Sequence, residues 1–174
     1  MVQEPVLVHY CTEKETSVSA DACSFGLGAV VSQVQDDGTK RPVAYASRSM
    51  MSTEQRYAQI EKEALATMWA CEKFADYILG KDFTIETDHK PLVPLLGSRC
   101  LHNMPPRIQR VHTRLMRYSY WIVHVPGKDF CTADSLSRVQ LYQSLTKDKK
   151  QLNAKVNLYV SHIIDCLPTT ERRL

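Results

Sequence analysis

The chain has 174 residues, of which 44% are hydrophobic and 24% charged, a composition typical of one soluble globular domain. No apolar run approaches the roughly 20 residues that a membrane helix needs, and no signal peptide opens the chain, so we expect no membrane partner and an intracellular, cytoplasmic location. The net charge of +3 is unevenly spread: residues 1–88 hold 8 Lys+Arg against 14 Asp+Glu, whereas residues 89–128 hold 7 Lys+Arg and no acid. This separation of charge suits a nuclease that binds cations in one region and phosphates in another. It also fits two faces of a protein that are merely solvated differently.

Three β-strands are predicted first, at residues 17–20, 27–33 and 42–46, with Asp21 at the end of the first and the turn Asp36-Asp37-Gly38 before the third. We expect these consecutive strands to pair antiparallel. A long central helix follows, from a capping-box pattern at Ser52 and Gln55, through apolar residues at helical spacing, to Gly80.

The second half alternates strands and helices. Residues 83–87 form a fourth predicted strand, which ends on Asp88, and residues 92–96 a short helix. Pro105 and Pro106 open an amphipathic helix at residues 107–118, residues 121–125 form a fifth strand, and a last helix begins near Thr132. The order βββαβαβα predicts an α/β fold with a five-stranded mixed sheet flanked by helices.

Acidic side chains stand where the predicted strands end. Asp21 and Asp88 each follow a strand, so both carboxylates can reach a common cleft. On the long helix, Glu61 and Glu63 lie at about +100° and −60° from Ile60, and periodicity does not choose between them. Asp134 lies near a helix start, a position that the helix dipole alone would explain.

Five motifs in order carry a family resemblance. They are Ala20-Asp21-Ala22-Cys23 with residues 26–30, residues 41–48, residues 57–66, residues 87–92, and residues 125–128 followed by residues 133–138. Together they resemble the ribonuclease H domain of gypsy-type LTR retrotransposon reverse transcriptases, which are parts of Pol polyproteins.

The resemblance implies a ribonuclease H-like fold and a site of four carboxylates, carried by Asp21, Glu63, Asp88 and Asp134. It selects Glu63 because the family's catalytic Glu directly precedes an Ala-Leu-Ala-like run. The implied cofactors are two Mg²⁺ ions, with Mn²⁺ able to substitute, and such hard cations prefer oxygen ligands. The implied reaction is hydrolysis of the RNA strand of an RNA/DNA hybrid, next to a polymerase domain of the same polyprotein.

Substrate contacts are expected at two places. Arg107, Arg110, Arg114 and Arg117 fall within an arc of about 80° on the predicted helix and could bind phosphates, although a merely solvated arginine face has the same pattern. Gln59 resembles the position from which the family reaches the minor groove of the hybrid, where 2′-hydroxyls mark RNA.

The chain departs from the family's usual pattern in the loop before the last Asp. Cellular ribonucleases H commonly carry a His there, whereas residues 125–130 contain none, and Phe130 stands where the family more often has Asn. Product release and one substrate contact could differ accordingly. Cys23, where the family usually has Ser, is a milder departure.

The six cysteines stand singly in the sequence, without the spacing of a zinc site or of a disulfide framework. We therefore expect free thiols.

We divide the chain into a ribonuclease H-like domain at residues 1–138 and a partly helical connector at residues 139–174. An apolar stripe in the tail, formed by Val156, Val160, Ile163, Ile164 and Leu167, could instead dock on the domain, and its basic excess could add affinity for nucleic acid. Two other functions remain as alternatives. The first is a catalytically silent module that only binds nucleic acid, and the retention of all four acids disfavours it. The second is an integrase core, which carries its acids in the order Asp, Asp, Glu, and it is disfavoured because the Glu comes second here.

Overall fold

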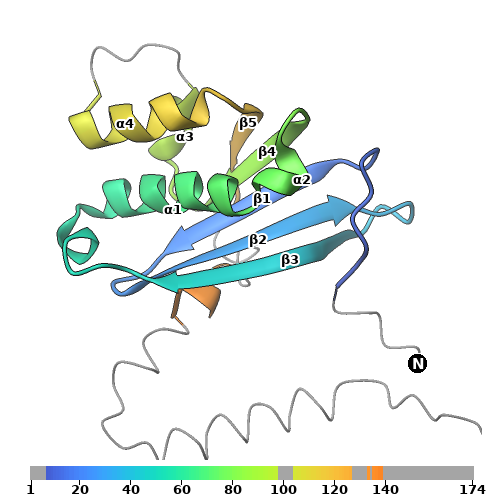
Figure 1. Ribbon diagram of the computed structural model, residues 1–174, viewed down its shortest axis with the longest axis horizontal. Helices are drawn as coiled ribbons and strands as arrows, with labels where there is room; N and C mark the ends of the chain where they lie inside the picture. Colours follow the sequence, from blue (N-terminus) through green and yellow to red (C-terminus); the bar gives the residue numbers. More distant parts are fainter. Residues whose placement is uncertain (1–6, 98–103, 127–132, 134, 139–174) are drawn as a thin grey trace, which may run out of the picture.

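A five-stranded mixed sheet forms the centre of the computed structural model, which describes residues 7–97, 104–126, 133 and 135–138. The strand order is β3-β2-β1-β4-β5. Helices α1, α3 and α4 lie on one side of the sheet, and the short helical segment at residues 135–138 lies on the other (Figure 1). The predicted five-stranded α/β fold is therefore confirmed.

The first three strands form an antiparallel unit, as the sequence predicted. They are β1 (Thr16–Ala22), β2 (Gly26–Val34) and β3 (Lys40–Ser49). The register of β2 and β3 shifts between Val31 and Ser32, which pair with Ala44 and Pro42. Val43 is the extra residue, and because β3 is an edge strand the sheet tolerates a proline that cannot donate a hydrogen bond.

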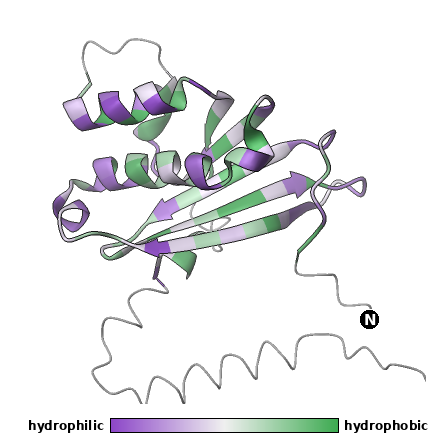
Figure 2. Cartoon of the chain, viewed as in Figure 1, coloured by the Kyte–Doolittle hydropathy of each residue, from purple (hydrophilic) through white to green (hydrophobic). Residues whose placement is uncertain are grey.

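Two parallel strands complete the sheet. β4 (Asp82–Thr87) pairs with β1, and β5 (Ser119–His124) pairs with β4. Parallel neighbours end at the same edge of a sheet, so the residues that follow β1 and β4 lie close together. Figure 2 shows hydrophobic residues along the middle of β2, mixed shades along β1, and a hydrophilic end of β1, so polar side chains lie at that edge of the sheet.

The long helix begins later than predicted. Tyr57 and Ala58 have extended backbones, with ψ of 152° and 153°, and a short 3-10 helix, η1 (Glu54–Arg56), precedes them. The capping box expected at Ser52 and Gln55 is wrong, because Glu54 instead accepts the Met51 N–H at 2.8 Å. Helix α1 (Gln59–Lys73) therefore starts at Gln59.

The helix also ends earlier than predicted. Phe74, at φ −103° and ψ 21°, separates α1 from the one-turn α2 (Ala75–Ile78). The later helices are α3 (Leu92–Gly97) and α4 (Pro106–Leu115). Because α4 ends at Leu115, Arg117 lies beyond the helix, and the predicted four-arginine arc on one helix face is wrong at its last member.

The core lies between the sheet and the helices above it. Val18, Leu27 and Ile85 from the strands are fully buried, as are Ala64 and Cys71 from α1. Cys11, Cys23 and Cys71, the cysteines within the described residues, are free, as expected. No helix in this described part of the chain is both long and apolar enough to cross a membrane.

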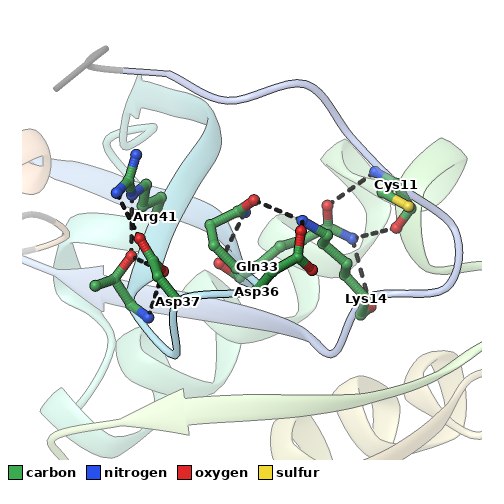
Figure 3. Close-up of polar contacts among 8 residues, drawn as sticks. Cys11, Lys14, Gln33, Asp36, Asp37 and Arg41 are labelled. Carbon is green, nitrogen blue, oxygen red and sulfur yellow. Dashed lines mark hydrogen bonds and ion pairs between the residues drawn. The ribbon is translucent and has the colours of Figure 1, made fainter.

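A buried glutamine near the end of β2 binds the segment that precedes β1 (Figure 3). Gln33 is fully buried, and its amide accepts the Cys11 N–H at 2.9 Å and donates to the Cys11 carbonyl at 2.7 Å and to Thr16 Oγ1 at 2.9 Å. Lys14 adds contacts to Gln35 and Asp36. A buried amide whose donors and acceptor are all used stabilises one arrangement of this segment.

The last helical segment packs closely on the opposite face of the sheet. A Cβ at Gly28 would lie 2.3 Å from the Ala133 carbonyl oxygen and 2.4 Å from the Ser137 nitrogen, so only glycine fits there. Cys23 Sγ also donates to the Ser137 carbonyl at 2.9 Å. These contacts hold Ala133 and residues 135–138 against the first two strands, next to the end of β1.

Candidate metal centre

Two of the predicted acids are brought together by the parallel pairing of β1 and β4. In the register of these strands Ser19 is opposite Glu86, so Asp21 and Asp88, two residues further along each chain, reach the same level. Asp21 is 6% exposed near the end of β1, whereas Asp88 is exposed in the loop after β4. The carboxyl edge of these strands therefore presents one buried and one solvent-accessible carboxylate.

The third acid comes from α1, which crosses above β1. Glu63 is 4% exposed, and it offers an oxygen that lies within 4.8 Å of carboxylate oxygens of both Asp21 and Asp88. Three carboxylates at this separation repel one another unless a cation or protons neutralise them. The arrangement is thus a set of oxygen ligands of the kind that Mg²⁺ and Mn²⁺ prefer.

Burial and charge act together on Glu63. Burial of the carboxylate, followed by the nearby negative charges of Asp21 and Asp88, raises the pKa of Glu63 to about 8, although hydrogen bonding to Gln59 and to the Ala22 backbone acts in the opposite direction. Its Oε2 atom is buried and accepts no hydrogen bond from the residues that the structure describes. A buried, unpartnered carboxylate oxygen is costly, and a bound cation would remove that cost.

The other helix glutamate has a different role. Glu61 Oε2 accepts the Ala58 N–H at 3.1 Å, at the start of α1, and pairs with Arg107 at 3.1 Å. It thereby caps the helix and joins α1 to α4. Glu61 is absent from the carboxylate cluster, so the structure brings together Asp21, Glu63 and Asp88, while Asp134 lies outside the described residues.

The carboxylates line an open pocket of about 440 Å³. The pocket is lined by Asp21, Ala22, Cys23, Ser24, Gln59, Glu63, Asp88, His89 and Arg138. Gln59 lies on its wall and donates to Glu63 Oε1 at 2.5 Å and to the Ala22 carbonyl at 3.2 Å. The predicted substrate residue Gln59 is thus part of the same pocket as the acids.

Sequence reasoning missed His89 and Arg138 as residues of the pocket wall. Both residues lie inside motifs that carry the family resemblance, and the position of each in the sequence indicates that it lies near an acid of the site. His89 directly follows Asp88, and Arg138 is four residues after Asp134, a spacing that puts two side chains on one face of a helix. An arginine near a carboxylate pocket is suited to a phosphate group.

The arginines predicted to bind phosphates lie on the outer side of α4 and just beyond it. Arg107 pairs with Glu61 and lies 4.3 Å from the centre of the Tyr57 ring, and Arg114 pairs with Glu72 at 3.6 Å. Arg117 lies over the ring of Tyr118 and donates to its hydroxyl. Arg110 is exposed, and no ion pair joins it to any residue in the described ranges. Three of the four arginines therefore have protein contacts as well as solvent exposure, whereas Arg110 is exposed without such an ion pair among the described residues.

A family model and the curated relatives both identify the family of this chain. Residues 11–118 match the family described as RNase H-like domain found in reverse transcriptase. The chain is 38% identical over 135 residues to the retrovirus-related Pol polyprotein from transposon opus of Drosophila melanogaster, and 34% identical over 143 residues to that from transposon gypsy of the same fly. These matches cover 77% and 81% of the chain but only 13% of each relative, so the chain spans about one eighth of their length.

A solved structure with the same fold is LC11-RNase H1 in complex with an RNA/DNA hybrid. The TM-score is 0.54 at 16% sequence identity, and the match covers 70% of this chain and 93% of that one. At this identity the likeness shows the fold alone. It places the five-stranded sheet described above among RNase H folds.

Proposed function

This chain belongs to the family of RNase H-like domains found in reverse transcriptase, and from that premise we propose that it is an endonuclease that hydrolyses the RNA strand of RNA/DNA hybrids with two divalent metal ions. The observation that carries the proposal is the cluster of Asp21, Glu63 and Asp88, whose carboxylate oxygens lie within 4.8 Å of one another. We further propose that the domain works within a retroelement Pol polyprotein, beside a polymerase domain, in a cytoplasmic particle.

The residues fit the proposed ions. The donors are carboxylates, which suit Mg²⁺ or Mn²⁺, and the buried Oε2 of Glu63 has no hydrogen-bond partner among the described residues. When bound, two such ions would activate a water molecule and stabilise the negative charge of the departing oxygen. Asp21, Glu63 and Asp88 would hold them, and we propose Asp134 as the fourth ligand.

The chain itself contributes the placement of the acids. The parallel register fixes Asp21 and Asp88 at one level, and α1 places Glu63 beside them. Ala133 and Ser137, on either side of the proposed fourth acid in the sequence, pack against Gly28, which pairs with Asp21. Since these supports are backbone contacts, the ligands would be prearranged before substrate binds, which reduces the free energy needed to organise them.

We propose that α4 binds the phosphates of the hybrid. Arg110 is exposed and already available, whereas Arg107 and Arg114 would exchange their ion pairs with Glu61 and Glu72 for phosphate contacts. The guanidinium groups of Arg107 and Arg114 belong to side chains that are 54% and 62% exposed. Ion pairs at such exposure contribute only about 0–1 kcal/mol, so the exchange costs little.

The proposal is tested with a hybrid labelled on either strand, in Mg²⁺ and in EDTA. We expect Mg²⁺-dependent cleavage of the RNA strand alone, with 3′-hydroxyl and 5′-phosphate ends, because water and not the 2′-hydroxyl would attack the phosphate. Asp21→Asn and Glu63→Gln should remove cleavage, and Glu61→Gln, as matched control, should retain most of it. A silent module would bind the hybrid without cutting it, and cyclic phosphate products would contradict the proposed mechanism.

A further inference from the structure

The amide of Gln59 occupies a particular place between the first strand and the long helix. Its nitrogen donates to Glu63 Oε1 at 2.5 Å and to the carbonyl of Ala22 at 3.2 Å, and Ala22 directly follows Asp21. Gln59 and Glu63 are one helical turn apart, which puts both side chains on the same face of α1. One side chain therefore connects the strand that carries Asp21 with the helix glutamate.

The hydrogens of this amide fix its orientation. A glutamine side-chain nitrogen has two hydrogens, and both are used, one for each contact. The opposite orientation would place the amide oxygen against a carboxylate oxygen and a carbonyl oxygen, which is repulsive. The amide can therefore hold Glu63 in only one of its two orientations.

The contact with Gln59 also makes the two carboxylate oxygens of Glu63 different from each other. Oε1 accepts the hydrogen bond from Gln59, whereas Oε2 is buried and has no hydrogen-bond partner among the described residues. Since rotation of the carboxylate would break the bond to Oε1, Oε2 stays the oxygen that is free to bind a cation. When Glu63 is ionised, as it would be on binding a cation, the strength of hydrogen bonds to charged acceptors makes this restraint substantial.

We propose that Gln59 is a positioning residue of the metal centre: its amide locks the Glu63 carboxylate so that Oε2 is the metal ligand, and it ties that ligand to the strand of Asp21. The inference rests on the proposed metal-dependent function and assigns to Gln59 a role different from the expected contact with the minor groove. With both amide hydrogens used, only the amide oxygen of Gln59 is left for a substrate hydroxyl group.

The test uses Gln59→Met, which keeps the length of the side chain and cannot donate a hydrogen bond. Gln55→Met is the matched control, because Gln55 donates to the Met50 carbonyl and lies outside the pocket wall. For the full chain and both variants, the melting temperature is measured against Mg²⁺ concentration, and the affinity for a hybrid is measured separately in EDTA. The first readout reports metal binding without any need for activity.

For Gln59→Met we expect the Mg²⁺ concentration at half of the maximal stabilisation to rise about tenfold, with hybrid affinity in EDTA unchanged. The rate of cleavage at limiting Mg²⁺ should fall and recover at high Mg²⁺, and Gln55→Met should behave as the wild type. An unchanged Mg²⁺ midpoint together with weaker hybrid binding would overturn the inference and make Gln59 a substrate contact. If the wild type gains no stability from Mg²⁺, the proposed function itself fails, and the inference fails with it.

Discussion

Replacing Glu63 with glutamine should make the metal-free protein more stable at alkaline pH. The substitution keeps the shape of the side chain and removes its charge, so it isolates the cost of ionising a carboxylate in this pocket. The pKa of Glu63 is about 8 in the folded chain, against 4.5 as the ordinary value. A raised pKa means that the folded state binds this proton more tightly than the unfolded state does.

The difference between these two pKa values determines the direction and the size of the change in the free energy of unfolding. The contribution of protonated Glu63 to stability is fully present below pH 4.5 and is lost as the pH rises to about 8. A difference of about 3.5 pKa units corresponds to about 3–5 kcal/mol, at 1.36 kcal/mol per unit and allowing for water that enters an open pocket. In EDTA, Glu63→Gln should match the wild type near pH 5 and exceed it by about this amount at pH 9.

Urea unfolding of the full chain in EDTA at several pH values between 5 and 9 measures the effect. Glu61→Gln is the matched control: it loses the ion pair with Arg107, at a cost of about 0–1 kcal/mol, keeps an amide oxygen that can accept the Ala58 N–H, and should keep the wild-type slope. Mg²⁺ at pH 8 should stabilise the wild type and not Glu63→Gln. Parallel pH profiles of wild type and Glu63→Gln would refute the electrostatic reasoning.

Three further outcomes are expected. Gly28→Ala should lower the free energy of unfolding by about 1–3 kcal/mol and impair cleavage, because its methyl group meets backbone atoms of Ala133 and Ser137, whereas Gly97→Ala, which meets only a side-chain atom at 3.3 Å, should be mild; equal effects would refute the close packing. Gln33→Leu should cost about 2–4 kcal/mol in urea unfolding, since it removes the hydrogen bonds of a buried amide, and a loss below 1 kcal/mol would contradict that role. A chain ending at Gln140 should keep its melting temperature and its cleavage rate, and a large drop in melting temperature would show instead that the apolar stripe of the tail docks on the domain.

Much of the fold could be predicted from the sequence because local patterns carry it. The five strands are found where alternation and turn residues placed them, and Asp21 and Asp88 stand at strand ends as expected. The ends of α1 could not be predicted, because they depend on Glu54 taking the N–H of Met51 and on the backbone of Phe74. Those contacts are not visible in a periodic pattern.

The site shows the same division between local and long-range information. The helical wheel left Glu61 and Glu63 open, and only the family resemblance chose Glu63. The crossing of α1 over β1 separates them, since it sends Glu63 to the carboxylates and Glu61 to Arg107. Likewise, the buried network of Gln33 and the contact at Gly28 join segments far apart in the chain, which spacing alone does not reveal.

A divalent cation bound by Asp21, Glu63 and Asp88 is central to the proposed function, and the most direct measurement locates that cation. A crystal of the full chain grown with Mn²⁺ would show the metal by its anomalous scattering. We expect Mn²⁺ in contact with carboxylate oxygens of all three residues, with Glu63 contributing the oxygen that does not accept the hydrogen bond of Gln59, and no such signal in a crystal of Asp21→Asn. An empty site at a Mn²⁺ concentration that supports full cleavage, or Mn²⁺ bound only elsewhere, would contradict the account.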